Sequence, residues 1–172
     1  MPTLIIFSGL SATGKTTLAR GLARQIGATY LRIDSIEQAL RDSDAVANPV
    51  NDAGYCVGYA LAKENLLLGR HVVADSVNPL SVTRNAWLVV ATEAQAQALE
   101  IEVRCSHVSE HRRRTEIRSS DIPGLRLPSW SDVISREYDP WDREHLVLDT
   151  AVDSIEAAIR KILDEFEKIN RP

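Results

Sequence analysis

Short apolar runs alternate with amphipathic segments along most of the chain. Residues 3–8 form a β-rich apolar run that ends at Gly9, which is typical of a buried strand. The next segment, 15–26, has apolar residues at helical spacing, Leu18, Leu22 and Ile26, and Gly27 follows it as a stop signal. The chain therefore begins with a predicted strand, a tight glycine-bounded loop and a predicted helix.

The same alternation continues to the end of the chain. Further strands are predicted at 29–33, 71–74, 101–105 and 146–148, and further helices at about 34–41, 53–68, 79–99, 110–118, 130–138 and 154–169. A polar loop at 43–52 and a Pro- and Gly-containing excursion at 119–129 interrupt the pattern. Strands that alternate with helices are typical of a parallel sheet. We expect an α/β fold in one domain over residues 1–172.

Composition narrows the class of protein. The 172 residues include 20 basic and 24 acidic side chains, a formal net charge of −4, so any site for an anion has to be local. This balance does not favour nucleic acid or an anionic membrane as a partner. No apolar stretch approaches the length of a membrane span, and Cys56 and Cys105 lack a disulfide or metal spacing. We expect a cytoplasmic protein, and its oligomeric state leaves no sign in the sequence.

The loop between the first strand and helix carries the clearest chemistry. Residues 9–16, GLSATGKT, match the pattern GxxxxGK[ST] in the strand–loop–helix context that phosphate binding requires. Backbone N–H groups of such a loop surround phosphate oxygens at the positive end of the helix. Lys15 can reach the β- and γ-phosphates, and Thr16 can offer its hydroxyl to Mg²⁺. The predicted binding residues for ATP are Gly9, Ser11, Ala12, Thr13, Gly14, Lys15, Thr16 and Thr17.

With this motif and five predicted strands, the sequence resembles the small P-loop kinases. That group includes AAA_33-like ATP-binding kinases, adenylylsulfate kinase, gluconate kinase, chloramphenicol phosphotransferase, zeta-type toxins and the kinase domain of polynucleotide kinases. The resemblance implies a three-layer P-loop NTPase with strand order 2-3-1-4-5. It also implies a short arginine-bearing lid, which falls at about 112–130 here.

Asp34 follows the second predicted strand, at the edge of the sheet where ligands bind in open parallel folds. In the kinases named above an aspartate at this place is the catalytic base, which accepts the proton of an attacking hydroxyl. A helix N-cap is the alternative for Asp34. Adenylylsulfate and polynucleotide kinases often have an arginine three residues later, whereas this chain has Glu37. Glu37 favours a neutral or cationic acceptor, unless it only completes a capping box.

The third strand leads into a polar segment. The run that ends at Asp75 is Walker-B-like, and Asp75 is a candidate ligand of Mg²⁺. Residues 75–84 resemble the Asp-x-x-Asn-Pro…Arg stretch of polynucleotide-kinase-type domains, which implies that Asn78 and Arg84 lie near the acceptor or the phosphates. The alternative is that Asp75 and Asn78 only satisfy a turn before the next helix.

The predicted lid is rich in arginine. Its candidates are Arg112, Arg113, Arg114, Arg118 and Arg126. Arg114 and Arg118 are four residues apart and share a helix face, so we expect them to meet the transferring phosphoryl group, with Arg126 nearer the acceptor. The alternative is a solvated face in which Glu110 and Glu116 offset the positive charge.

Together these features predict an ATP- and Mg²⁺-dependent phosphotransferase that acts on a hydroxyl of a small molecule. Lys15, Asp34, Arg114 and Arg118 are the predicted catalytic residues, Thr16 and Asp75 the metal ligands, and Asp34, Glu37, Asn78, Arg84 and Arg126 the acceptor residues. The acceptor pocket is expected from residues 43–59 and the lid. Two alternatives stay open: a polynucleotide or nucleoside 5′-hydroxyl kinase, and a nucleotide-binding regulatory or toxin-like module with low intrinsic turnover.

Overall fold

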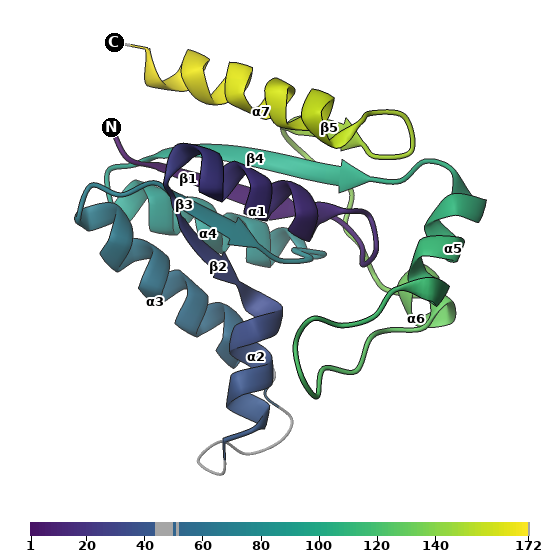
Figure 1. Cartoon of the computed structure of the whole chain (residues 1–172). Coiled ribbons are helices and arrows are strands. Elements are labelled where there is room, and N and C mark those ends of the chain that lie inside the picture. Colours follow the sequence, from purple (N-terminus) through teal and green to yellow (C-terminus); the bar gives the residue numbers. More distant parts are fainter. Residues whose placement is uncertain (44–49, 51, 172) are drawn as a thin grey trace.

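A computed structural model describes residues 1–43, 50 and 52–171 and shows five parallel strands in one sheet (Figure 1). The strand order, β2-β3-β1-β4-β5, confirms the predicted topology. The strands are β1 (Thr3–Ser8), β2 (Thr29–Arg32), β3 (Val72–Asp75), β4 (Gln97–Arg104) and β5 (Leu146–Asp149). Every residue of β1 is buried, because neighbouring strands flank it and helices cover both faces of the sheet.

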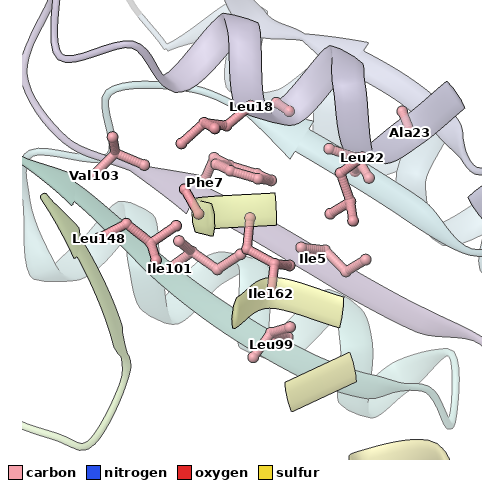
Figure 2. Close-up of a cluster of buried hydrophobic side chains, with 13 residues drawn as sticks. Ile5, Phe7, Leu18, Leu22, Ala23, Leu99, Ile101, Val103, Leu148 and Ile162 are labelled. Atoms are coloured by element: carbon pink, nitrogen blue, oxygen red, sulfur yellow. The ribbon is translucent and has the colours of Figure 1, made fainter. Parts of the chain in front are cut away.

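Helices lie on both faces of the sheet (Figure 1). The helices of the described residues are α1 (Lys15–Ile26), α2 (Ile33–Arg41), α3 (Ala53–Leu67), α4 (Ser81–Glu93), α5 (Val108–Ile117), α6 (Trp130–Ile134) and α7 (Ile155–Asn170), and α5 and α6 lie beyond the ends of the strands (Figure 1). On one face, α1 and α7 pack against β1 and β4 around Phe7, Leu22 and Ile162 (Figure 2). On the other, α3 and α4 enclose a second core around Trp87. The fold is thus the three-layer α/β arrangement that was expected.

Two predicted helices are shorter in the structure. The helix predicted at 79–99 ends at Glu93, and Gln95 then adopts a left-handed φ of 53° before β4 begins at Gln97. Residues 97–99 pair in register with β1 instead, so sheet pairing overrides their helical periodicity. The helix predicted at 130–138 ends at Ile134. The chain that follows reaches the start of α4, where the Asp139 carboxylate accepts a hydrogen bond from the Ser81 N–H at 2.7 Å.

The polar loop predicted at 43–52 lies mostly outside the described residues, as does part of the acceptor pocket expected at 43–59. Within residues 1–43, 50 and 52–171, no helix has both the length and the apolar character that crossing a membrane requires.

Candidate active site

A cavity of about 760 Å³ opens at the carboxyl ends of the strands, between the glycine-rich loop, α2, α6 and the segment 118–129, which lies within the range predicted as a lid. Six of the predicted loop residues line it: Ser11, Ala12, Gly14, Lys15, Thr16 and Thr17. Five other predicted residues also line it: Asp34, Glu37, Asp75, Arg118 and Arg126. Residues from distant parts of the sequence therefore meet at one cavity.

The glycine-rich loop has a backbone that only small residues allow. Gly9 has a φ of 132°, and a Cβ there would overlap the carbonyl oxygen of Val103 on β4. Gly14 caps α1 with a φ of 95°. Gly9 and Thr13 do not line the cavity. They shape the loop, since the Thr13 hydroxyl donates a hydrogen bond to the carbonyl oxygen of Leu10 at 2.9 Å.

Lys15 is buried at the start of α1, beside two carboxylates. Its ammonium donates a hydrogen bond to the carbonyl oxygen of Leu10 at 2.9 Å. Burial lowers the pKa of Lys15, while the charges of Asp75 and Asp34 oppose that shift. A partly desolvated cation in a loop of backbone amides is well suited to bind a phosphate.

Asp75 ends β3, directly beside the ends of β1 and β2 in the sheet register. It is 3% exposed, and its Oδ2 accepts a hydrogen bond from the hydroxyl of Tyr30 at 2.7 Å. Thr16 lines the same cavity. A carboxylate and a hydroxyl are oxygen ligands of the kind that Mg²⁺ prefers. Among the described residues, no group of three or more His, Cys, Asp or Glu side chains is arranged to hold a metal ion.

Asp34 lies in the first turn of α2, because β2 ends at Arg32 and the helix begins one residue before this carboxylate. The predicted capping roles are wrong. Arg32 is the N-cap residue, and no side chain caps this helix. The Asp34 side chain is half-exposed, lines the cavity, and its Oδ2 lies 3.9 Å from Nη2 of Arg32. Glu37 packs against Gly54, and its Oε2 accepts a hydrogen bond from Arg41 at 2.9 Å, so its charge is paired.

The two lid arginines predicted to act together lie in different places. Arg118 follows α5 and lines the main cavity, where its Nε and Nη2 are buried without a hydrogen-bond partner among the described residues. Burial lowers the pKa of Arg118. Arg114 instead donates hydrogen bonds to Oε1 of Glu110 at 2.8 Å and to Oγ1 and the carbonyl oxygen of Thr150 at 2.8 and 3.0 Å. It lines a second cavity of about 270 Å³ on the α7 side of the loop, not the main one.

Asn78 and Arg84 do not reach either cavity, which corrects the expectation from the sequence. Asn78 is fully buried and bonds to the backbone of Phe7 and to the indole N–H of Trp87. Arg84 is 1% exposed, and its guanidinium donates hydrogen bonds to four carbonyl oxygens, of Asn78, Pro79, Asp139 and Pro140. Both side chains satisfy buried main chain, which the sequence alternative anticipated for Asn78 but not for Arg84.

Sequence reasoning missed several residues of the main cavity. They are Arg20, Arg32, Arg41 and Arg136, whereas Tyr55 and Asp121 lie within the ranges 43–59 and 112–130 expected for the acceptor pocket and the lid. The missed residues come from separate elements, α1, β2, α2 and the segment after α6. No local spacing connects them, so only the folded chain brings them to one place.

A family model described as an AAA domain, AAA_33, matches residues 4–127, which is well over half of the chain. The chain belongs to the AAA_33 family. A curated relative, cytidylate kinase from Rhodococcus opacus (strain B4), is 28% identical over 136 residues, which cover 73% of this chain and 58% of that protein. The chain therefore spans little more than half of that relative's length.

Solved structures share the fold of this AAA_33 protein. Kti12 from Chaetomium thermophilum, in complex with ADP-AlF3, aligns with a TM-score of 0.74 and 22% identity over 98% of this chain and all (100%) of that one. The APS kinase CysC from Mycobacterium tuberculosis, in complex with AMPPNP and APS, aligns with a TM-score of 0.70 and 18% identity over 96% and 98% of the two chains. The AAA_33 protein is thus related to small P-loop kinases and has their nucleotide-binding loop.

Proposed function

We propose that this AAA_33 protein is an ATP-dependent kinase that transfers the γ-phosphoryl group to a hydroxyl of a small-molecule acceptor. One observation carries the proposal: the Asp34 carboxylate lines the same cavity as Lys15 of the phosphate-binding loop. A phosphotransferase needs a phosphate cradle and a group that accepts the proton of the attacking hydroxyl. A module that only binds nucleotides needs no carboxylate at this place.

Each side chain then has a role that its position permits. Lys15 and the loop amides bind the β- and γ-phosphates, and Asp34 accepts the hydroxyl proton as oxygen attacks phosphorus. Arg118 stabilises the negative charge of the transferring group. Thr16 and Asp75 would hold Mg²⁺. When bound, this ion neutralises phosphate charge.

We place the base of the nucleotide in the second cavity. It adjoins the loop at Gly14 and Thr17 and is lined by Arg114, Thr150 and Ile155. An adenine placed there would stack against the Arg114 guanidinium and the apolar start of α7. We therefore assign Arg114 to the base of ATP rather than to the transferring phosphoryl group.

The proposal is tested by screening hydroxyl-bearing metabolites for a mass increase of one phosphoryl group with ATP and Mg²⁺. Asp34→Asn should retain AMPPNP binding, while transfer falls by about 10²–10⁴-fold, the usual contribution of a general base. If Asp34→Asn transfers the phosphoryl group at the wild-type rate, Asp34 is not the general base. ATP consumption that responds to no acceptor would favour the regulatory or toxin-like module.

A nucleoside monophosphate kinase is the second candidate, which the resemblance to cytidylate kinase favours. Its acceptor oxygen belongs to a phosphate, whose second pKa is about 6, so the oxygen is already ionised at neutral pH. The two candidates therefore respond differently to one substitution. With CMP as acceptor, Asp34→Asn should leave most of the rate intact, whereas a hydroxyl acceptor needs the carboxylate.

A further inference from the structure

The lid carries a carboxylate that two arginines hold inside the main cavity. Asp121 Oδ2 lies 2.6 Å from Nη2 of Arg20 on α1, and Oδ1 accepts a hydrogen bond from Nη1 of Arg32 at 2.8 Å. The Arg32 hydrogen bond, followed by that of Arg20, holds the pKa of Asp121 at about 2, well below its ordinary 3.8. The carboxylate is therefore an anion at every physiological pH.

This contact leaves much of the Arg32 guanidinium unused. The Arg32 side chain is only 10% exposed, and its Nε is buried without a hydrogen-bond partner among the described residues. A guanidinium has five N–H donors, and the Asp121 carboxylate takes one hydrogen bond from Arg32. A buried donor without a partner destabilises the fold, and a larger or better-placed oxyanion would remove that cost. The Arg32 guanidinium can therefore donate more hydrogen bonds than the Asp121 carboxylate accepts from it.

The position of Arg32 connects it to the transfer chemistry. Its Nη2 lies 3.9 Å from the proposed base, Asp34. The carboxylate that holds it comes from the lid loop, and the Asp121 side chain is 48% exposed, so another anion can replace it without unpacking the core. Glu37, the residue that favoured an uncharged or cationic acceptor in the sequence, is neutralised by Arg41 and does not repel an anion here.

We propose that Arg20 and Arg32 form a subsite for an oxyanionic group of the acceptor, a phosphate or a carboxylate, which Asp121 occupies until the acceptor displaces it. The inference rests on the proposed kinase function, because it names the acceptor class of that same cavity. An acceptor anchored at Arg32 lies close to Asp34, in the cavity that the phosphate-binding loop also lines. Asp121 then competes with the acceptor for the two arginines. The planar guanidinium groups make the subsite selective for oxyanions.

The test uses inorganic phosphate as the probe on the full chain saturated with AMPPNP, so that the phosphate-binding loop is already filled. Binding is followed by NMR at the Arg32 Nε–H resonance, and by thermal stabilisation for variants that lack it. Asp121→Asn should bind phosphate about tenfold more tightly than the wild type, because the competing charge is gone. Arg32→Gln and Arg20→Gln should each lose about tenfold in affinity relative to the wild type. A parallel titration with acetate distinguishes a phosphate subsite from a carboxylate subsite.

Matched variants separate the subsite from general changes of charge. Asp164→Asn on the exposed side of α7 and Arg24→Gln on the exposed side of α1 should bind phosphate like the wild type. Equal or weaker phosphate binding by Asp121→Asn, or unchanged binding by both arginine variants, overturns the subsite. AMPPNP affinity is measured separately in every variant. If the wild type does not bind AMPPNP, the kinase proposal fails, and the Arg32 Nε–H resonance of the wild type and of Asp121→Asn still shows whether phosphate binds at the subsite.

Discussion

The Nε2 atom of His111 lies 2.7 Å from the carbonyl oxygen of Ser11, so a ring on α5 holds the phosphate-binding loop. His111 is 7% exposed, and its ring packs edge-on against Trp130 of α6 with 5.2 Å between ring centroids. Because the ring N–H donates to the loop carbonyl, it helps to orient the loop's amide groups inward. The His111 side chain therefore connects α5 and α6 to the phosphate-binding loop.

His111→Phe should weaken AMPPNP binding by about 2- to 10-fold. The substitution keeps a ring against Trp130 but removes the hydrogen bond to Ser11, and a single neutral hydrogen bond contributes about 0.5–1.5 kcal/mol. Isothermal titration calorimetry measures the effect. His107→Gln, at an exposed position just before α5, serves as the control and should bind normally. Equal affinities for all three proteins would mean that the contact does not position the loop.

Arg118→Gln should lower the rate of transfer by about 10³-fold while the affinity for AMPPNP changes little. The reason is that an arginine facing the transferring group acts mainly on the charge of the transition state. The matched control is Arg112→Gln, because Arg112 is exposed and pairs with Glu116 on the outer side of α5. Single-turnover kinetics with the identified acceptor provide the measurement. A loss confined to AMPPNP affinity would instead make Arg118 a ground-state binding residue.

Arg84→Ala should destabilise the fold by about 3 kcal/mol or more. The guanidinium satisfies buried carbonyl oxygens and lies over the rings of Tyr138 and Trp141, at 5.1 and 4.4 Å from their centroids. Its removal leaves acceptors unpaired and a cavity in the core. Urea unfolding measures the loss, with the exposed Arg24→Ala as the reference. The KM for ATP of the folded fraction at low temperature should stay unchanged. A raised KM for ATP with unchanged stability would instead indicate that Arg84 acts in the substrate site.

The contribution of Asp121 to stability should disappear in acid. Its folded-state pKa of about 2 lies below the ordinary 3.8, so the stabilisation is present above pH 3.8 and is lost as the pH falls toward 2. The difference in the free energy of unfolding between the wild type and Asp121→Asn should therefore shrink over that interval. Urea titrations at several values between pH 6 and 2.5 follow it, with Asp164→Asn as the reference for a lost surface charge. A difference independent of pH would show that the ion pair with Arg20 and Arg32 adds nothing.

The sequence alone determined the fold class and the phosphate-binding loop, while its resemblance to the small P-loop kinases implied the strand order. The fold class and the loop depend on local patterns: apolar strands that must be buried on both faces, and a glycine spacing that suits a phosphate-binding loop. The same local information also placed Lys15 and Asp34 at the edge of the sheet where the cavity lies. The local pattern wrongly predicted a helix at residues 97–99. These residues form a strand instead, because hydrogen bonding to β1 stabilises the strand more than the amphipathic periodicity stabilises a helix.

The tertiary structure alone decided what the polar side chains around the loop contact. Nothing in the sequence distinguishes the environments of Arg84 and Arg118. In the structure, Arg84 donates hydrogen bonds to main-chain carbonyl groups inside the core, whereas Arg118 lines the cavity. Glu37 is paired with Arg41, and Asp121 is paired with Arg20 and Arg32, so the negative charge that Glu37 was expected to present to the acceptor is offset. Charge in a cavity depends on which groups from distant segments neutralise one another, and that is settled only when the segments meet.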